Sequence, residues 1–104
     1  MVLKDLTPEE RQAARQKALD ARTTRAKIKS EFADGKLSLQ EVFAQADEDE
    51  AVARMRTIDL LTALKGIGEI RAQGIMEECE ISLNRRLRGL GHRQRNALID
   101  ALGR

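Results

Sequence analysis

The sequence predicts an all-α protein in which a long N-terminal helix packs on a compact helical domain. Its 104 residues include one proline, and the apolar residues are mainly Ala, Leu and Ile, which favour helices. No segment of any length alternates apolar and polar residues as a half-buried strand does. A chain of this length holds a single hydrophobic core. We expect residues 36–104 to form the compact domain that contains it and residues 1–35 to form a basic helix or arm.

The first helix is marked at both ends. The run Leu6-Thr7-Pro8-Glu9-Glu10 offers a capping threonine, a proline at the first helical position and acids in the first turn. Asp34-Gly35 supplies a stop, so one helix is predicted from about Pro8 to about Ala33. Its large apolar residues are few, namely Leu19, Ile28 and Phe32. We therefore expect the first half to project as an arm and the second half to pack through Ile28 and Phe32.

Three shorter helices are predicted next. Ser38-Leu39-Gln40-Glu41 repeats the capping-box spacing and opens a helix. The inward face of this helix is predicted to be Leu39, Val42, Phe43 and Ala46, which recur at helical intervals. Val52 and Met55 are expected in a further short helix. Thr57 is expected to cap another, which carries Leu60, Leu61 and Leu64.

The acidic run Asp47-Glu48-Asp49-Glu50 has two interpretations. It forms a solvated turn, or it stabilises the N-terminus of the next helix. It lacks the glycine and the terminal glutamate spacing of a calcium loop. The single cysteine, Cys79, excludes internal disulfides and a multi-cysteine zinc site, and we expect it to fill space. We therefore predict neither a metal nor a cofactor.

A glycine turn follows these helices. A helix is predicted to end at Lys65, the turn Gly66-Ile67-Gly68 follows, and a new helix begins near Glu69. Glycine adopts backbone angles that other residues avoid and lets a partner approach closely, and Ile67 is expected to point inward. The free N–H groups at the start of the new helix, supported by its dipole, can hold a phosphate. Glycines also occur at helix corners for purely structural reasons, so the turn alone is weak support.

Basic residues gather near the C-terminus. The net charge is +2, but residues 36–64 hold three Lys/Arg against six Asp/Glu and residues 65–104 hold eight against five. Within residues 81–95 there are five arginines and no acid: Arg85, Arg86, Arg88, Arg93 and Arg95. Clustered guanidinium groups suit phosphate, which they bind through two parallel hydrogen bonds. The alternative interpretation is a solvated basic loop.

Several classes of protein are excluded. No stretch approaches twenty apolar residues, which excludes a membrane span, and the N-terminus lacks the apolar core of a secretory signal. We therefore expect a cytoplasmic protein. His92 is the single histidine and has no supporting catalytic motif, so no catalytic residues and no enzymatic activity are predicted. Aromatic residues are only 2% of the chain, which disfavours binding of single-stranded nucleic acid by base stacking.

The turn and the arginine cluster carry a resemblance to known proteins. Gly66-Ile67-Gly68 resembles the helix–hairpin–helix phosphate-binding turn, and residues from about 57 to 104 look like the helix–two-turns–helix module of a small-subunit ribosomal protein and of formamidopyrimidine-type DNA glycosylases. Nearly the whole chain is similar to the actinobacterial integration host factors, which are small nucleoid-associated proteins. The runs that carry this similarity are Leu6-Thr7-Pro8-Glu9, Ala21-Arg22, Arg25-Ala26, Ser38-Leu39-Gln40-Glu41-Val42, Leu60-Leu61, Gly66-Ile67-Gly68, Arg71-Ala72, Ile75-Met76-Glu77 and Arg85-Arg86-Leu87-Arg88-Gly89-Leu90-Gly91.

The resemblance implies a function. It implies binding of double-stranded DNA in the nucleoid with little sequence preference, DNA bending or compaction, and support of phage integrase recombination. The residues that it implies are a backbone phosphate cradle at Gly66, Ile67 and Gly68 and basic contacts at Arg71, Arg85, Arg86 and Arg88. The chain departs from the family pattern at Lys65, where a proline is usual, and at Glu69, where a lysine is frequent. Lys65 is expected to add positive charge beside the turn, whereas Glu69 is unfavourable beside a phosphate.

Some alternatives stay open. His92-Arg93 replaces smaller residues of the family, which makes Arg93 a further candidate contact. The basic residues of the first helix are either solvated and paired with acids or form a second DNA contact, for which the candidates are Arg15, Arg22, Arg25 and Lys29. Structured RNA, as in a ribosome-associated module, is the alternative partner. No apolar stripe remains for a coiled-coil partner, so a monomer is expected.

Overall fold

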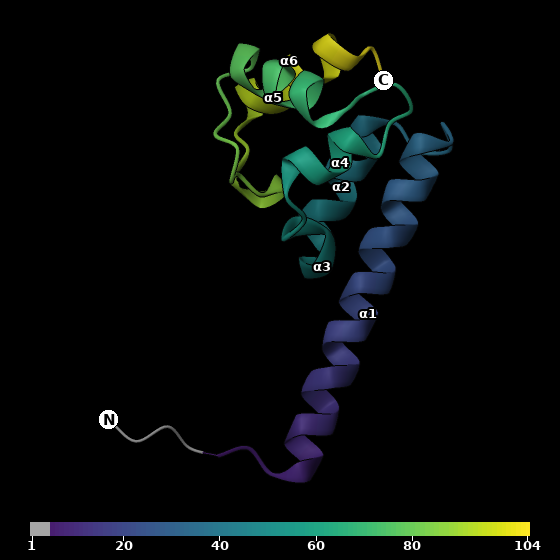
Figure 1. Ribbon diagram of the computed structural model, residues 1–104, viewed down its shortest axis with the longest axis vertical. Helices are drawn as coiled ribbons and strands as arrows, with labels where there is room; N and C mark the ends of the chain where they lie inside the picture. The colour runs from purple at the N-terminus through teal and green to yellow at the C-terminus, as the bar shows by residue number, and fades with distance from the viewer. Residues whose placement is uncertain (1–4) are drawn as a thin grey trace.

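A long helix runs along one side of a group of short helices in the computed structural model, which describes residues 5–104 (Figure 1). The long helix is α1 (Pro8–Ala33). The others are α2 (Leu39–Glu48), α3 (Glu50–Ala53), α4 (Thr57–Thr62), α5 (Glu69–Glu78), the 3₁₀-helix η1 (Leu87–Gly89) and α6 (His92–Leu102). Within the described residues there is no strand, and one isolated bridge pairs Arg56 with Arg86. The all-α prediction is confirmed.

Helix α1 has the predicted limits and the predicted division. The Thr7 hydroxyl accepts a hydrogen bond from the Glu10 amide at 3.1 Å, and Pro8 is the first helical residue. Residues 5–20 are all exposed, whereas Ile28 and Phe32 are buried. Figure 1 shows the N-terminal half of α1 extending beyond the other helices. The helix is held by its second half because only that half carries large buried apolar side chains.

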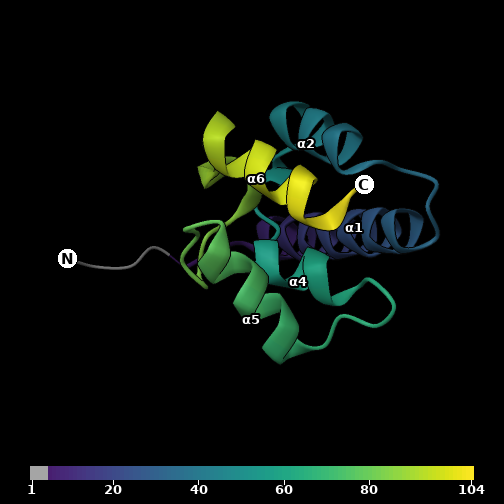
Figure 2. The same ribbon diagram turned by 90° about the horizontal axis from the view of Figure 1, so that it is seen from above.

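The core is formed by side chains from every helix. Its fully buried large residues are Phe32, Leu39, Leu60, Leu61, Met76, Leu87, Leu98, Val42 and Val52. Ser38 and Glu41 form the predicted reciprocal capping box at the start of α2, and the Ser38 amide and hydroxyl lower the pKa of the Glu41 carboxyl. Seen from above, α2 and α5 lie on opposite sides of the molecule with α6 and α4 between them (Figure 2).

Two predictions about α4 are wrong. Thr57 does not cap this helix, because Arg56 occupies the capping position and Thr57 is fully buried. Its hydroxyl and its amide turn inward and both donate to the Arg85 carbonyl, at 2.9 and 3.0 Å. The helix ends at Thr62 rather than at Lys65, and the chain continues in turns to Gly68. Met55 is buried as expected but lies beyond the end of α3.

Candidate functional site

A groove lies between one face of α1 and the residues 49–59 and 86–88 of the compact domain. It encloses about 1220 Å³, which exceeds the usual size of a small-molecule pocket. Its lining holds eight basic and four acidic side chains. The basic ones are Lys17, Arg22, Arg25, Lys29, Arg54, Arg56, Arg86 and Arg88. We call this surface the basic groove, and its excess of positive charge suits a large anionic partner.

One wall of the basic groove is made by two short segments that lie side by side, and each is extended at the residue where they pair, Arg56 in one and Arg86 in the other. Residues 54–57 and 85–87 are joined where Leu87 N–H donates to the Met55 carbonyl at 3.0 Å and Thr57 donates to Arg85. Successive side chains of an extended segment point to opposite sides. Met55, Thr57 and Leu87 are therefore buried, while the arginines between them are exposed. The Arg86 guanidinium also donates to the Arg54 carbonyl, which holds it across this wall.

The other wall is one face of α1. Arg22, Arg25 and Lys29 follow at spacings of three and four, so they share a face. Arg25 is half-buried, and its guanidinium donates to the Ala51 carbonyl at 3.4 Å. Arg15 lies outside the lining, and its guanidinium donates to the Gln12 side chain at 3.2 Å. The structure thus brings three of the four candidate residues of α1 together with Arg86 and Arg88.

The glycine turn lies at the other end of α4 from the Arg56–Arg86 bridge. Gly66 has a φ of +84°, which favours glycine. Gly68 is the N-cap of α5, and no side chain caps the amides that follow it. A methyl group added at Gly66 or Gly68 would meet nothing within 4 Å, so both glycines leave an open approach to the backbone.

The glycine turn has a smaller excess of positive charge around it than the basic groove has. Lys65, Glu69 and Arg71 are all exposed, and Ile67 is partly buried against the core as expected. None of the three charged side chains has a hydrogen bond or ion pair with another described residue. Two bases and one acid thus surround the open amides, which is a weaker positive surface than the basic groove.

Two candidate arginines lie apart from both surfaces. The Arg93 guanidinium is 4.0 Å from the Glu80 carboxylate, and both side chains are exposed. Arg85 contributes its carbonyl to the Thr57 bonds, and its side chain lies along Gly89, where an added methyl group would come within 2.7 Å of it. Arg85 is exposed but does not line the groove.

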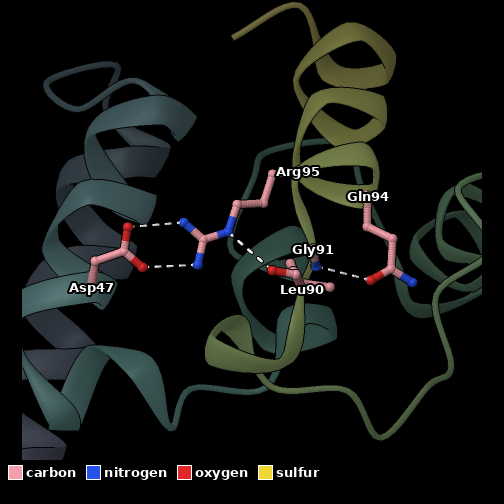
Figure 3. Close-up of polar contacts among 5 residues, drawn as sticks. All are labelled: Asp47, Leu90, Gly91, Gln94 and Arg95. Carbon is pink, nitrogen blue, oxygen red and sulfur yellow. Dashed lines mark hydrogen bonds and ion pairs between the residues drawn. The ribbon is translucent and has the colours of Figure 1, made fainter.

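Arg95, which the sequence places in the basic cluster, is a structural residue. Figure 3 shows its guanidinium between the Asp47 carboxylate and the Leu90 carbonyl. It donates to both Asp47 oxygens, at 2.9 and 3.1 Å, and to Leu90 at 3.2 Å, and it lies 5.1 Å from the centre of the Phe43 ring. These bonds lower the pKa of the Asp47 carboxyl. Asp47 therefore joins α2 to α6, and Asp49 caps α3 by accepting from the Ala51 amide.

Sequence reasoning missed Arg54 and Arg56. The acidic balance of residues 36–64 concealed them. The alternation Arg54-Met55-Arg56-Thr57 was the available signal, because its two arginines are exposed while Met55 and Thr57 are buried.

Other chemistry has little support in the described residues. Among residues 5–104, no group of three or more His, Cys, Asp and Glu side chains is placed to hold a metal ion. Cys79 is buried. Its burial raises the pKa of its thiol, and the negative charge of Glu78 raises it further by a smaller amount. His92 is exposed at the start of α6. No helix in the described part of the chain is long and apolar enough to cross a membrane.

Comparisons with a domain family, with curated proteins and with solved structures all match this chain to similar proteins. The S13-like H2TH domain family matches residues 32–102. Curated relatives named integration host factor are 46% identical over 99% of this chain in Mycobacterium tuberculosis and 45% identical over 90% in Streptomyces coelicolor, and the matches cover 98% and 88% of those proteins. A solved structure described as sIHF bound to an 8-bp palindromic DNA is similar with a TM-score of 0.79 and 40% identity, over 83% of this chain and 97% of that one.

Proposed function

Because this chain belongs to the integration host factor family of actinobacteria, we propose that it is a nucleoid-associated protein that binds double-stranded DNA. The binding is mainly to the phosphate backbone, so its sequence preference is low. The observation that supports this most strongly is the basic groove, which gathers eight Lys/Arg side chains from distant parts of the chain. The similar structure that is described with bound DNA adds independent support.

The groove and the glycine turn give the molecule two separate surfaces for phosphate. In this proposal the groove holds one stretch of backbone through Arg22, Arg25, Lys29, Arg86 and Arg88. The turn holds another stretch through the amides after Gly66-Ile67-Gly68, with Lys65 and Arg71 beside it. Two contacts from one monomer bend a duplex or bridge two duplexes. Arg85 and Arg93 act at the margins, because neither lines the groove.

The family relationship also supports a proposal for the biological setting. We propose an architectural, non-enzymatic protein that acts as a monomer in the cytoplasm, compacts DNA there and supports site-specific recombination by a phage integrase. The arm of residues 1–35 and the domain of residues 36–104 act together, because they supply opposite walls of the groove.

A salt titration tests the proposal. Binding of the wild type to duplex DNA should weaken steeply with salt, because each phosphate contact releases counterions. An Arg85/Arg86/Arg88→Ala variant should bind all sequences more weakly, and its salt slope should fall by about one for each contacting arginine lost. The Lys27→Gln variant is the control, because Lys27 is an exposed base of α1 outside the groove.

Two further nucleic acids decide between partners. Single-stranded DNA should bind more weakly than duplex, because the chain has only two aromatic residues. Structured ribosomal RNA is included because the matching family is described as S13-like. Tighter binding to RNA than to duplex DNA would identify structured RNA, rather than DNA, as the partner. Salt-independent binding of duplex DNA, single-stranded DNA and RNA would contradict a phosphate interface.

A further inference from the structure

Two arginines in the basic groove face each other directly. Arg56 and Arg86 are the two partners of the isolated antiparallel bridge, and both line the groove. Directly opposite residues of such a pair carry their side chains on the same side of the backbone. Like charges in this arrangement repel, and the repulsion opposes folding.

The surrounding backbone forces this arrangement on the two arginines. Thr57 donates through both its amide and its hydroxyl to the Arg85 carbonyl, and Leu87 N–H donates to the Met55 carbonyl. Met55, Thr57 and Leu87 are buried. The residues between these buried positions must therefore face outward together, whatever their charge.

No acidic side chain among residues 5–104 forms an ion pair with Arg56 or Arg86. Among residues 5–104, no side-chain hydrogen bond or ion pair involves Arg56. The Arg86 guanidinium donates to a neutral carbonyl, that of Arg54. Asp59, three residues after Arg56, lines the same groove but forms no ion pair with either arginine, and Glu50 is paired with Arg54 at 2.6 Å. The groove thus presents two arginines from directly opposite backbone positions, and both have hydrogen-bond donors that no other described residue uses.

We propose that Arg56 is a further DNA-binding residue and that it shares one backbone phosphate with Arg86. The proposal rests on the proposed function and adds a residue to it. A phosphate between two guanidinium groups replaces their repulsion by attraction and accepts hydrogen bonds from both. The free protein therefore retains a repulsion that DNA relieves, and binding and stability respond to Arg56 in opposite directions.

The test compares Arg56→Gln with Lys27→Gln, which removes the same charge from α1 outside the groove. Binding to a 20-bp duplex of mixed sequence is measured across a salt series. Arg56→Gln should weaken binding about tenfold at low salt and lower the salt slope by about one. Its Tm without DNA should rise by about 2 °C at low salt, because the repulsion is gone. Added salt should remove this difference from the wild type.

A conservative variant separates charge from geometry. Arg56→Lys should keep the salt slope of the wild type but recover only part of the affinity, because an ammonium group cannot bind phosphate through two parallel bonds. Equal binding by Arg56→Gln and Lys27→Gln would overturn the proposal, and so would a lower Tm of Arg56→Gln than of the wild type. Absence of salt-dependent duplex binding by the wild type would instead contradict the proposed function itself.

Discussion

Glu80 is the one non-glycine residue in the described chain with a positive φ, at 58°. It follows the C-cap of α5, where glycine usually occupies the left-handed conformation. Its carbonyl accepts from the Gln94 side chain at 2.9 Å, which ties the end of α5 to the start of α6. The strained backbone is therefore part of the connection between the two helices of the two-turn segment.

Glu80→Gly should stabilise the fold by about 0.5–1 kcal/mol, because glycine adopts this conformation without strain. The Gln94 bond is to the backbone and survives the substitution. The exposed ion pair with Arg93 at 4.0 Å contributes little. Thermal unfolding measures the change. Glu78→Gly, in the last turn of α5, is the matched control and should destabilise the fold; a loss of stability in both variants would contradict the strain argument.

Asp47 links stability to pH. Its pKa lies below the ordinary value of 3.8, mainly because of the hydrogen bonds from Arg95. A carboxyl whose pKa is lowered by folding contributes stability above its unfolded pKa and loses it as the pH falls through the folded pKa. The Tm of the wild type should therefore fall as the pH drops below about 4, and Asp47→Asn should have a lower Tm at neutral pH and a smaller fall. Asp100→Asn on α6 is the control, and parallel curves for all three proteins would show that the pair is not linked to folding.

At the scale of elements, the helices were predictable and their connections were not. The limits of α1 and the start of α2 follow from local signals, namely the proline of α1 and the Ser38 capping box. The error at Thr57 has a tertiary cause, because the hydroxyl bonds a carbonyl 28 residues away. Arg95 was assigned to the basic cluster for the same reason, since only the fold brings Asp47 to it. Local patterns carry no information about such long-range partners.

The candidate site shows the same limit. The sequence indicated the arginines of residues 85–88 and the basic face of α1 as separate features. The structure places both on one groove, and it adds Arg54 and Arg56 from a segment whose net charge is negative. Charge summed along the chain conceals the basic surface that Arg54 and Arg56 form, because these exposed arginines alternate with buried residues.

Deleting residues 1–20 tests the role of α1. The fold should lose less than about 0.5 kcal/mol of stability, because Ile28 and Phe32 remain and residues 5–20 are exposed. Compaction of long DNA should decrease, because Lys17 and the adjoining end of the α1 wall are gone while Arg22, Arg25 and Lys29 remain. Thermal unfolding and the extension of a single tethered DNA molecule measure the two effects. Unchanged compaction would exclude residues 1–20 from the DNA contact and leave Arg22, Arg25 and Lys29 as its part of α1.

For the whole molecule, the two phosphate surfaces are unequal. The groove holds eight bases and four acids, whereas Lys65 and Arg71 flank the turn together with Glu69. Long-range attraction of a polyanion follows the larger excess of positive charge. The groove should therefore supply most of the electrostatic affinity, and the turn should fix a second point on the duplex.

The most direct test of this account is an NMR titration of the protein with a short duplex that follows the arginine Nε–H and backbone amide signals. The account predicts that Arg22, Arg56, Arg86 and Arg88 shift at the lowest DNA concentrations and that Gly66 and Gly68 follow. The Arg95 signal should stay in place, because its Nε–H is bonded to Leu90 within the fold. Shifts confined to residues 66–71, with the groove arginines unchanged, would contradict the central claim that the basic groove is the main DNA-binding surface.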